Sequence, residues 1–110
     1  MPKMPSLTAE NDSMRIIELK KTLEESKSYM GKTFHVREIG IFGSFVKGSH
    51  TVQSDVDILI DFKHGHKDLF NFMRLKYYLE NLLGKKVDLV MKKAVKPMLK
   101  KNILREVEYV

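Results

Sequence analysis

Residues 41–60, with the sequence IFGSFVKGSHTVQSDVDILI, decide how the rest of this chain is interpreted. An apolar run ends at Gly43-Ser44, a polar loop follows, and a second apolar run carries Asp55 and Asp57 at its start. The apolar runs predict two buried strands, and the Gly-Ser pair predicts a turn that opens a short helix. Because Asp55 and Asp57 are two residues apart, a strand would project both carboxylates from the same face.

The two halves of this stretch suit a nucleoside triphosphate and its metal ions. Gly43 has no Cβ, so the backbone can approach a ligand closely. Ser44 offers a hydroxyl and an N–H near a helix start, where anions are favoured. Neighbouring carboxylates repel each other unless a cation lies between them, and hard oxygen ligands suit Mg²⁺. Either half alone is common in turns and loops, but their order, spacing and flanking strands make the combination specific.

This stretch resembles the nucleotidyltransferase superfamily that includes DNA polymerase β-like and kanamycin nucleotidyltransferase-like enzymes, whose pattern is Gly-Ser, a variable loop and [Ser/Asp]-Asp-x-Asp. Residues 42–48, Phe-Gly-Ser-Phe-Val-Lys-Gly, and the ending at residues 86–110 are similar to the minimal nucleotidyltransferase (MNT) family, the antitoxins of HEPN–MNT toxin–antitoxin modules. Phe45 stands where that family usually has Arg or Tyr, and Lys47 keeps a cation where Arg is common. The resemblance covers roughly residues 36–110.

The resemblance implies a nucleotidyltransferase that transfers AMP from ATP to a tyrosine hydroxyl of a cognate HEPN ribonuclease toxin and so inactivates it. Two Mg²⁺ ions are the expected cofactors, ATP is the expected substrate, and a hetero-oligomer with the toxin is the expected assembly, with no nucleic acid required. The expected catalytic and metal-binding residues are three carboxylates: Asp55, Asp57 and Asp88. The expected nucleotide-binding residues are four positions around the loop: Gly43, Ser44, Lys47 and Ser54.

Alternatives stay open for the residues around the loop. Lys47 either contacts phosphate or is solvated, and Ser54 either contacts the ligand or serves as a capping hydroxyl that shapes the loop before Asp55. Phe45 either packs beside the nucleotide or belongs to the core. The residue types alone do not decide between these roles.

The third carboxylate has a competitor. Asp88 lies in a short apolar run that would form a strand beside the second one, and it either completes the site or faces water at a strand end. Asp61 shares a strand face with Asp57, but four residues of strand separate the two by about 13 Å. That distance is too large for one metal cluster, so Asp88 is the better candidate.

The remaining pattern alternates helices and strands and predicts an α/β fold, a small mixed sheet of three to four strands flanked by helices. One domain spans residues 1–110, with an N-terminal helix in residues 1–30, a catalytic sheet region in residues 36–90 and a basic C-terminal helix in residues 91–110. Expected strands are residues 36–42, 56–62 and 87–90. The first expected helix is residues 6–30, capped by Ser6 or Thr8 and ended by Gly31. A short second helix is expected at residues 44–47, and a third at residues 69–83 between the caps Asp68 and Gly84. Lys96 or Pro97 is expected to open the last helix.

Composition narrows the class of protein. The 110 residues include no Cys, which excludes disulfides and Cys-based zinc sites. No apolar run approaches the ~20 residues that span a membrane, and the start lacks the apolar stretch of a signal peptide, so a soluble cytoplasmic protein is expected. The net charge is +6, and residues 85–105 hold eight cations but one acid, Asp88. This segment could attract phosphates, RNA or an acidic partner, or could be a solvated helix face.

The small size indicates how the reaction would be organised. Residues 43–88 can hold a triphosphate and metal ions, which leaves little chain to build a pocket for an acceptor. A partner protein is therefore expected to supply the acceptor. The alternative is a binding antitoxin that neutralises its toxin by complex formation with little or no catalysis. Transfer to a small molecule such as an aminoglycoside ranks lower, since there is no room for a second-substrate domain.

Overall fold

A four-stranded mixed sheet forms the centre of the molecule in the computed structural model, which describes residues 15–66 and 68–110. The strand order is β3-β2-β1-β4; β1 runs antiparallel to β2 and β4, and β3 runs parallel to β2. The strands are β1 (Val36–Phe42), β2 (Val56–Phe62), β3 (Val87–Met91) and β4 (Glu108–Tyr109). The predicted fold, a small mixed sheet flanked by helices, is confirmed.

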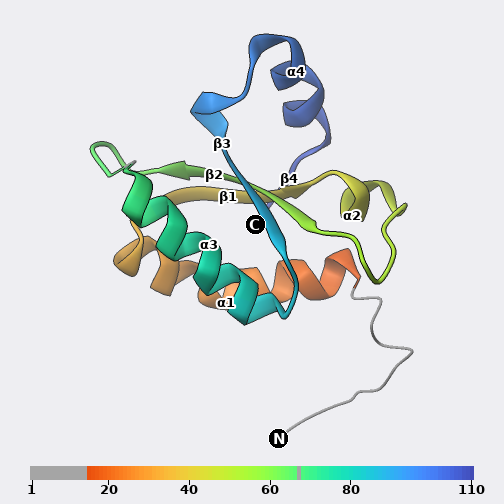
Figure 1. Cartoon of the computed structure of the whole chain (residues 1–110), viewed down its shortest axis with the longest axis horizontal. Helices are drawn as coiled ribbons and strands as arrows, with labels where there is room; N and C mark the ends of the chain where they lie inside the picture. The colour runs from red at the N-terminus through yellow and green to blue at the C-terminus, as the bar shows by residue number, and fades with distance from the viewer. Residues whose placement is uncertain (1–14, 67) are drawn as a thin grey trace, which may run out of the picture.

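The two faces of the sheet are covered differently (Figure 1). Helices α1 (Ile16–Thr33) and α3 (Leu69–Leu83) lie together on one face, and α4 (Pro97–Glu106) lies on the other. Side chains alternate along a strand, so β2 directs its even-numbered residues into the core beneath α1 and α3 and its odd-numbered residues to the α4 side. The core residues from these three elements include Val56, Ile58, Ile60, Leu19, Leu23, Leu75 and Leu79. The odd-numbered residues of β2 therefore face away from this core.

The ends of α3 and α4 agree with the sequence signals. Asp68 accepts a hydrogen bond from the backbone N–H of Asn71 at 2.8 Å, as a helix N-cap does. Gly84 follows α3 in the left-handed conformation with φ 67°. Lys96 is the N-cap of α4, and Pro97 is its first residue. These three predictions are confirmed.

The end of α1 differs from the prediction. The helix begins at Ile16, and the predicted caps Ser6 and Thr8 lie outside the described residues. At its other end the helix continues through Gly31 to Thr33, so the prediction that Gly31 ends it is wrong. Lys63 donates to the Gly31 carbonyl oxygen at 3.0 Å, and the left-handed residue of the connection is His35, with φ 60°. Tertiary contacts here outweigh the preference of glycine for a helix end.

The C-terminal region is more than the predicted helix. The 3-10 turn η2 (Lys92–Ala94) precedes α4. After α4, the strand β4 pairs with β1 at the edge of the sheet. Gly40 of β1 pairs with Tyr109 of β4, and a Cβ on Gly40 would lie 2.8 Å from the Val107 side chain. This close pairing fixes the chain just beyond α4. No helix in the described parts of the chain combines the length and apolar character needed to cross a membrane.

Candidate active site

The turn between β1 and α2 (Ser44–Lys47) is built around Gly43. Its φ of 77° and ψ of −146° belong to a region that residues with a side chain rarely enter. A Cβ at Gly43 would overlap the carboxylate of Asp57, and Asp57 is the Cα partner of Phe42 in the β1–β2 ladder. Glycine is therefore required here by the backbone conformation and by the Asp57 carboxylate, which lies directly against the turn.

Asp57 and Asp88 are neighbours across two parallel strands. They are Cα partners in the β2–β3 ladder, on the face opposite α1 and α3. Burial raises the pKa of Asp57 to about 6, with further contributions from the charge of Asp88, a hydrogen bond to Asp88 and the charge of Asp55. A hydrogen bond from the Ser44 backbone acts in the opposite direction on this pKa. The prediction that Asp88 lies in a third strand beside the second one is confirmed, and the pairing of the two strands brings Asp88 next to Asp57.

Asp55 lies at a different position than expected. It precedes β2 rather than lying on it, and its side chain is exposed. Within residues 15–66 and 68–110, no three or more His, Cys, Asp or Glu side chains already stand close enough to hold a metal ion. The donor chemistry nevertheless fits a hard divalent cation, because the half-buried Asp57 carboxylate lies beside that of Asp88 and is also affected by the charge of Asp55. No cationic side chain is among the causes of the raised pKa of Asp57.

The structure shows what the residues around the loop contact. Phe45 is buried, with 1% of its surface exposed, and stacks on His50 with ring centroids 4.1 Å apart, so it belongs to the core. Ser54 accepts a hydrogen bond from the Thr51 N–H at 2.8 Å and thereby shapes the loop. Lys47 is exposed and lies beside the Gly43 turn. Its contact with phosphate stays a prediction.

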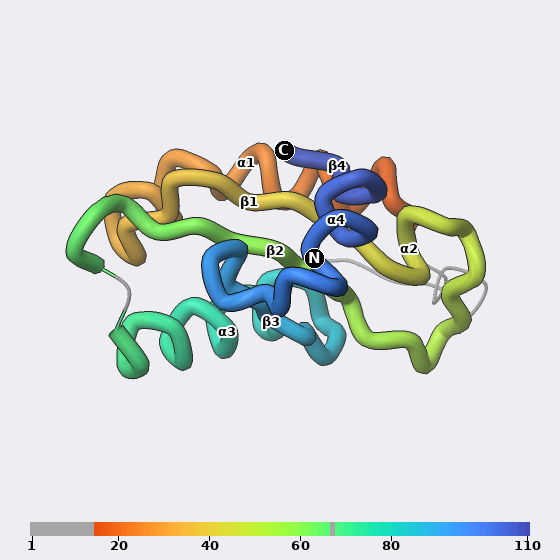
Figure 2. Tube along the Cα trace, turned by 90° about the horizontal axis from the view of Figure 1, so that it is seen from above, coloured from red at the N-terminus to blue at the C-terminus, as the bar shows by residue number. Residues whose placement is uncertain are grey.

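Glu106, the last residue of α4, also reaches this site, and the sequence analysis did not single it out. The Gly43 N–H donates to Glu106 Oε1 at 2.8 Å, and Lys47 Nζ lies 3.6 Å from Oε2. Figure 2 shows the end of α4 close to α2, although the two lie far apart in the sequence. The available signal was that Glu106 is the one acid in the α4 sequence PMLKKNILRE, directly after the basic segment.

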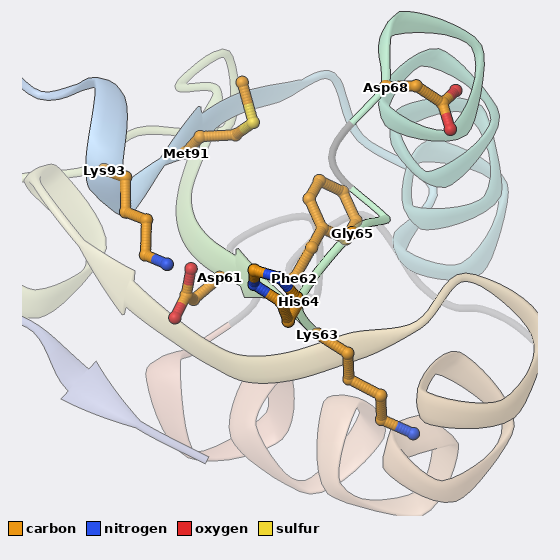
Figure 3. Close-up of a pocket in the computed structure, with 8 residues that line it drawn as sticks. All are labelled: Asp61, Phe62, Lys63, His64, Gly65, Asp68, Met91 and Lys93. Atoms are coloured by element: carbon orange, nitrogen blue, oxygen red, sulfur yellow. The ribbon is translucent and has the colours of Figure 1, made fainter.

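Asp61 lies in a separate place, at the far end of β2. It is buried and paired with Arg37, and it lines a cavity of about 450 Å³ (Figure 3). Lys93 points toward Asp61, and Lys63 points away from the cavity. Arg37 therefore compensates the charge of Asp61, whereas no cationic side chain is among the causes of the raised pKa of Asp57.

Comparison with known proteins agrees with this geometry. The family model described as "Nucleotidyltransferase domain" matches residues 16–110, which include the Gly43–Ser44 turn and all three carboxylates. The chain belongs to the nucleotidyltransferase domain family. The enzyme class predicted from the sequence, a nucleotidyltransferase, is thereby confirmed.

Three proteins similar to this nucleotidyltransferase domain illustrate the comparison. The protein adenylyltransferase MntA of Thermococcus cleftensis is 48% identical over 93 residues, which cover 84% of this chain and 93% of that protein. A solved structure described as a minimal nucleotidyltransferase has a TM-score of 0.75 and 32% identity, covering 87% of this chain and 96% of the other. A chain from the complex of a tri-AMPylated Shewanella oneidensis HEPN toxin with an MNT antitoxin has a TM-score of 0.59 and 18% identity, covering 82% and 70%, and shares the fold.

The raised pKa of Asp57 leads to a stability prediction for this nucleotidyltransferase domain. A carboxyl whose pKa is higher in the folded than in the unfolded state favours folding when it is protonated. Ionisation of Asp57 therefore begins to reduce the free energy of unfolding when the pH rises above about 4, its ordinary pKa, and the reduction is complete above about 6, its pKa in the fold. Asp57→Asn should therefore raise the free energy of unfolding of the metal-free protein at about pH 8 by about 1 kcal/mol, after allowance for solvent screening. This corresponds to a Tm increase of about 4–8 °C.

Thermal unfolding with EDTA at about pH 8 and about pH 5 measures this difference. The gain should shrink at the lower pH, because wild-type Asp57 is then mostly protonated. The matched control is Asp68→Asn, which keeps a capping side chain and lies away from the turn. A lower Tm for Asp57→Asn than for the wild type at about pH 8 would show that the ionised Asp57 carboxylate stabilises the fold.

Proposed function

We propose that this chain is a Mg²⁺-dependent protein adenylyltransferase that transfers AMP from ATP to a tyrosine hydroxyl of a HEPN ribonuclease toxin and so acts as its antitoxin. The observation that carries the proposal is the contact of Asp57 and Asp88 directly beside the Gly43–Ser44 turn. The relative in Thermococcus cleftensis is named a protein adenylyltransferase, and the Shewanella oneidensis complex contains an AMPylated HEPN toxin. Both names support a protein as the acceptor.

The triphosphate would be held at the turn. The Gly43 N–H and the Lys47 ammonium group are a hydrogen-bond donor and a cation on the same side of the site, as their shared contact with Glu106 demonstrates. Asp55, Asp57 and Asp88 would hold two Mg²⁺ ions, which neutralise phosphate charge and orient the reacting oxygens when bound. Ser44 would add its hydroxyl, while Ser54 keeps the loop before Asp55 in place.

The acceptor would approach from solvent, since Asp55 and Asp88 are both exposed. Asp88 would accept the proton of the tyrosine hydroxyl while the phenolic oxygen attacks the α-phosphorus of ATP. The bond between the α-phosphorus and the bridging oxygen to the β-phosphorus then breaks, and pyrophosphate leaves with the electron pair. An open carboxylate edge suits an acceptor presented by a folded partner better than a small diffusible molecule, which needs an enclosing pocket.

A binding antitoxin is the second candidate function, and α4 provides the observation that favours it. Met98 and Leu99 are 80% and 51% exposed, and the neighbouring exposed side chains include Lys100 and Lys101. Apolar side chains bordered by cations form a surface that could cover an acidic partner. On this view complex formation neutralises the toxin and catalysis is secondary.

Co-expression with the product of the adjacent gene, followed by intact-mass measurement of that product, tests the proposal. Adenylyl transfer adds the mass of one or more AMP groups, and tandem mass spectrometry locates them on tyrosine. A chain that carries Asp55→Asn and Asp57→Asn provides the catalytic control. A stable complex with no added mass on the partner for either chain would favour the binding antitoxin. Addition of a nucleotide to small molecules alone would contradict both candidates.

A further inference from the structure

Glu106 occupies the groups that the proposed triphosphate needs. Its two carboxylate oxygens face different donors: Oε1 accepts from the Gly43 N–H at 2.8 Å, and Oε2 lies 3.6 Å from Lys47 Nζ. The Glu106 side chain is 24% exposed, so the contact is partly shielded from water. One anionic side chain thus engages both the backbone and the cationic donors of the turn.

The backbone on either side holds Glu106 in this position. The Val107 N–H donates to the Ile103 carbonyl oxygen at 2.9 Å, which closes the last turn of α4. Directly afterwards, Glu108 and Tyr109 pair with β1 next to the Gly43 turn. Because the chain is fixed on both sides, movement of the Glu106 side chain alone can make or release the contact.

The Glu106 carboxylate contacts Gly43, against which the Asp57 carboxylate also lies. A phosphate group is an anion that seeks the same N–H and the same ammonium group. The carboxylate and a phosphate cannot occupy these donors together, because both would fill the same space and repel each other.

We propose that Glu106 is an internal competitor for the phosphate-binding donors of the turn, and that its side chain must leave Gly43 and Lys47 before ATP binds. The inference rests on the proposed function, because it takes the turn as the triphosphate site. Glu106 thereby lowers the apparent affinity for ATP and links nucleotide binding to the end of α4. A carboxylate that merely supports the turn would have the opposite effect, since its removal would weaken binding.

Two substitutions at Glu106 separate these possibilities. Glu106→Ala removes the competing group, so the Kd for ATP should fall by about tenfold, a typical effect of a hydrogen bond to a charged group. Glu106→Gln keeps the size and an acceptor oxygen for the Gly43 N–H but loses the charge facing Lys47, so a smaller decrease in Kd is expected. If Glu106→Ala perturbs the end of α4, Glu106→Gln still tests the competition.

Glu108→Gln is the matched control. Glu108 is an acid two residues further along the chain, and it pairs with Lys20 of α1 at 3.2 Å rather than with the turn. Its substitution removes the same charge from the same segment. We expect the Kd for ATP to stay within about twofold of the wild-type value, as for a surface substitution away from the site.

The measurement is calorimetric titration of the full chain with a non-hydrolysable ATP analogue and Mg²⁺, and in parallel with adenosine. Tighter binding of the analogue by Glu106→Ala, without tighter binding of adenosine, would show that the gain depends on the phosphates and would support the inference. Unchanged or weaker binding of the analogue by both Glu106 variants would overturn it. Absence of nucleotide binding by every variant, wild type included, would instead overturn the proposed function and the inference with it.

Discussion

A chain that carries Asp55→Asn and Asp57→Asn together is expected to lose adenylyl transfer by at least about 1,000-fold. Bound metal ions supply several kcal/mol of charge stabilisation in phosphoryl chemistry, and each 1.36 kcal/mol corresponds to a tenfold change in rate. An amide oxygen is neutral and does not balance the charge of a divalent cation. Transfer of label from the α-phosphate of ATP to the co-expressed partner measures the loss.

The double variant should remain folded, which separates lost chemistry from lost structure. Asn has nearly the same size as Asp, and the substitution removes repulsion at Asp57 instead of adding it. Its Tm should therefore equal or exceed the wild-type value in EDTA. Asp68→Asn is again the control and should transfer AMP at the wild-type rate, because Asp68 caps α3 away from the turn. Wild-type transfer rates in the double variant would remove Asp55 and Asp57 from the proposed machinery.

The same double variant distinguishes the two candidate functions in cells. If adenylyl transfer neutralises the toxin, growth protection should disappear together with the added mass on the partner. If complex formation neutralises it, protection should persist, because α4 with exposed Met98 and Leu99 is unchanged. Protection without modification would therefore identify the binding antitoxin.

Local signals explain why much of the site could be predicted from the sequence. The pairing of Asp57 with Asp88 follows from two apolar strands, each with an Asp in its second position, which lie parallel in register. Gly43 was recognisable because a glycine at the end of a strand often marks a close backbone approach. The group that approaches is the Asp57 carboxylate, which the sequence could not specify. Strand alternation and glycine chemistry act over a few residues and are therefore visible in the pattern.

Long-range contacts explain what could not be predicted. The contact between Gly43 and Glu106 joins residues 63 positions apart, and no local pattern carries that information. β4 is two residues long, too short to show alternation, and it exists because Gly40 allows the chain to approach β1. The helix that continues past Gly31 is a similar case, since a lysine from beyond the second strand binds its carbonyl oxygen.

Gly43→Ala is expected to reduce adenylyl transfer by about 100-fold, the effect of displacing a reacting group by about 1 Å. The added Cβ would overlap the Asp57 carboxylate, so Asp57 must move away from its position beside Asp88. The backbone must also keep a φ of 77° with a side chain present, a strain of about 1–3 kcal/mol. Both effects act on the same turn, so activity and Tm should fall together.

Gly48→Ala isolates the effect of the carboxylate, because Gly48 follows α2 with a φ of 76° and an added Cβ would meet no heavy atom of residues 15–66 and 68–110 within 4 Å other than those of Gly48 and its chain neighbours. Gly48→Ala should lower the free energy of unfolding by about 1 kcal/mol, because a residue with a side chain is strained in the left-handed conformation. Its adenylyl transfer should stay near the wild-type rate. Transfer and thermal unfolding measured for both variants under the same conditions give the comparison. Equal transfer rates in Gly43→Ala and Gly48→Ala would mean that the packing of Asp57 against the turn does not position it for catalysis.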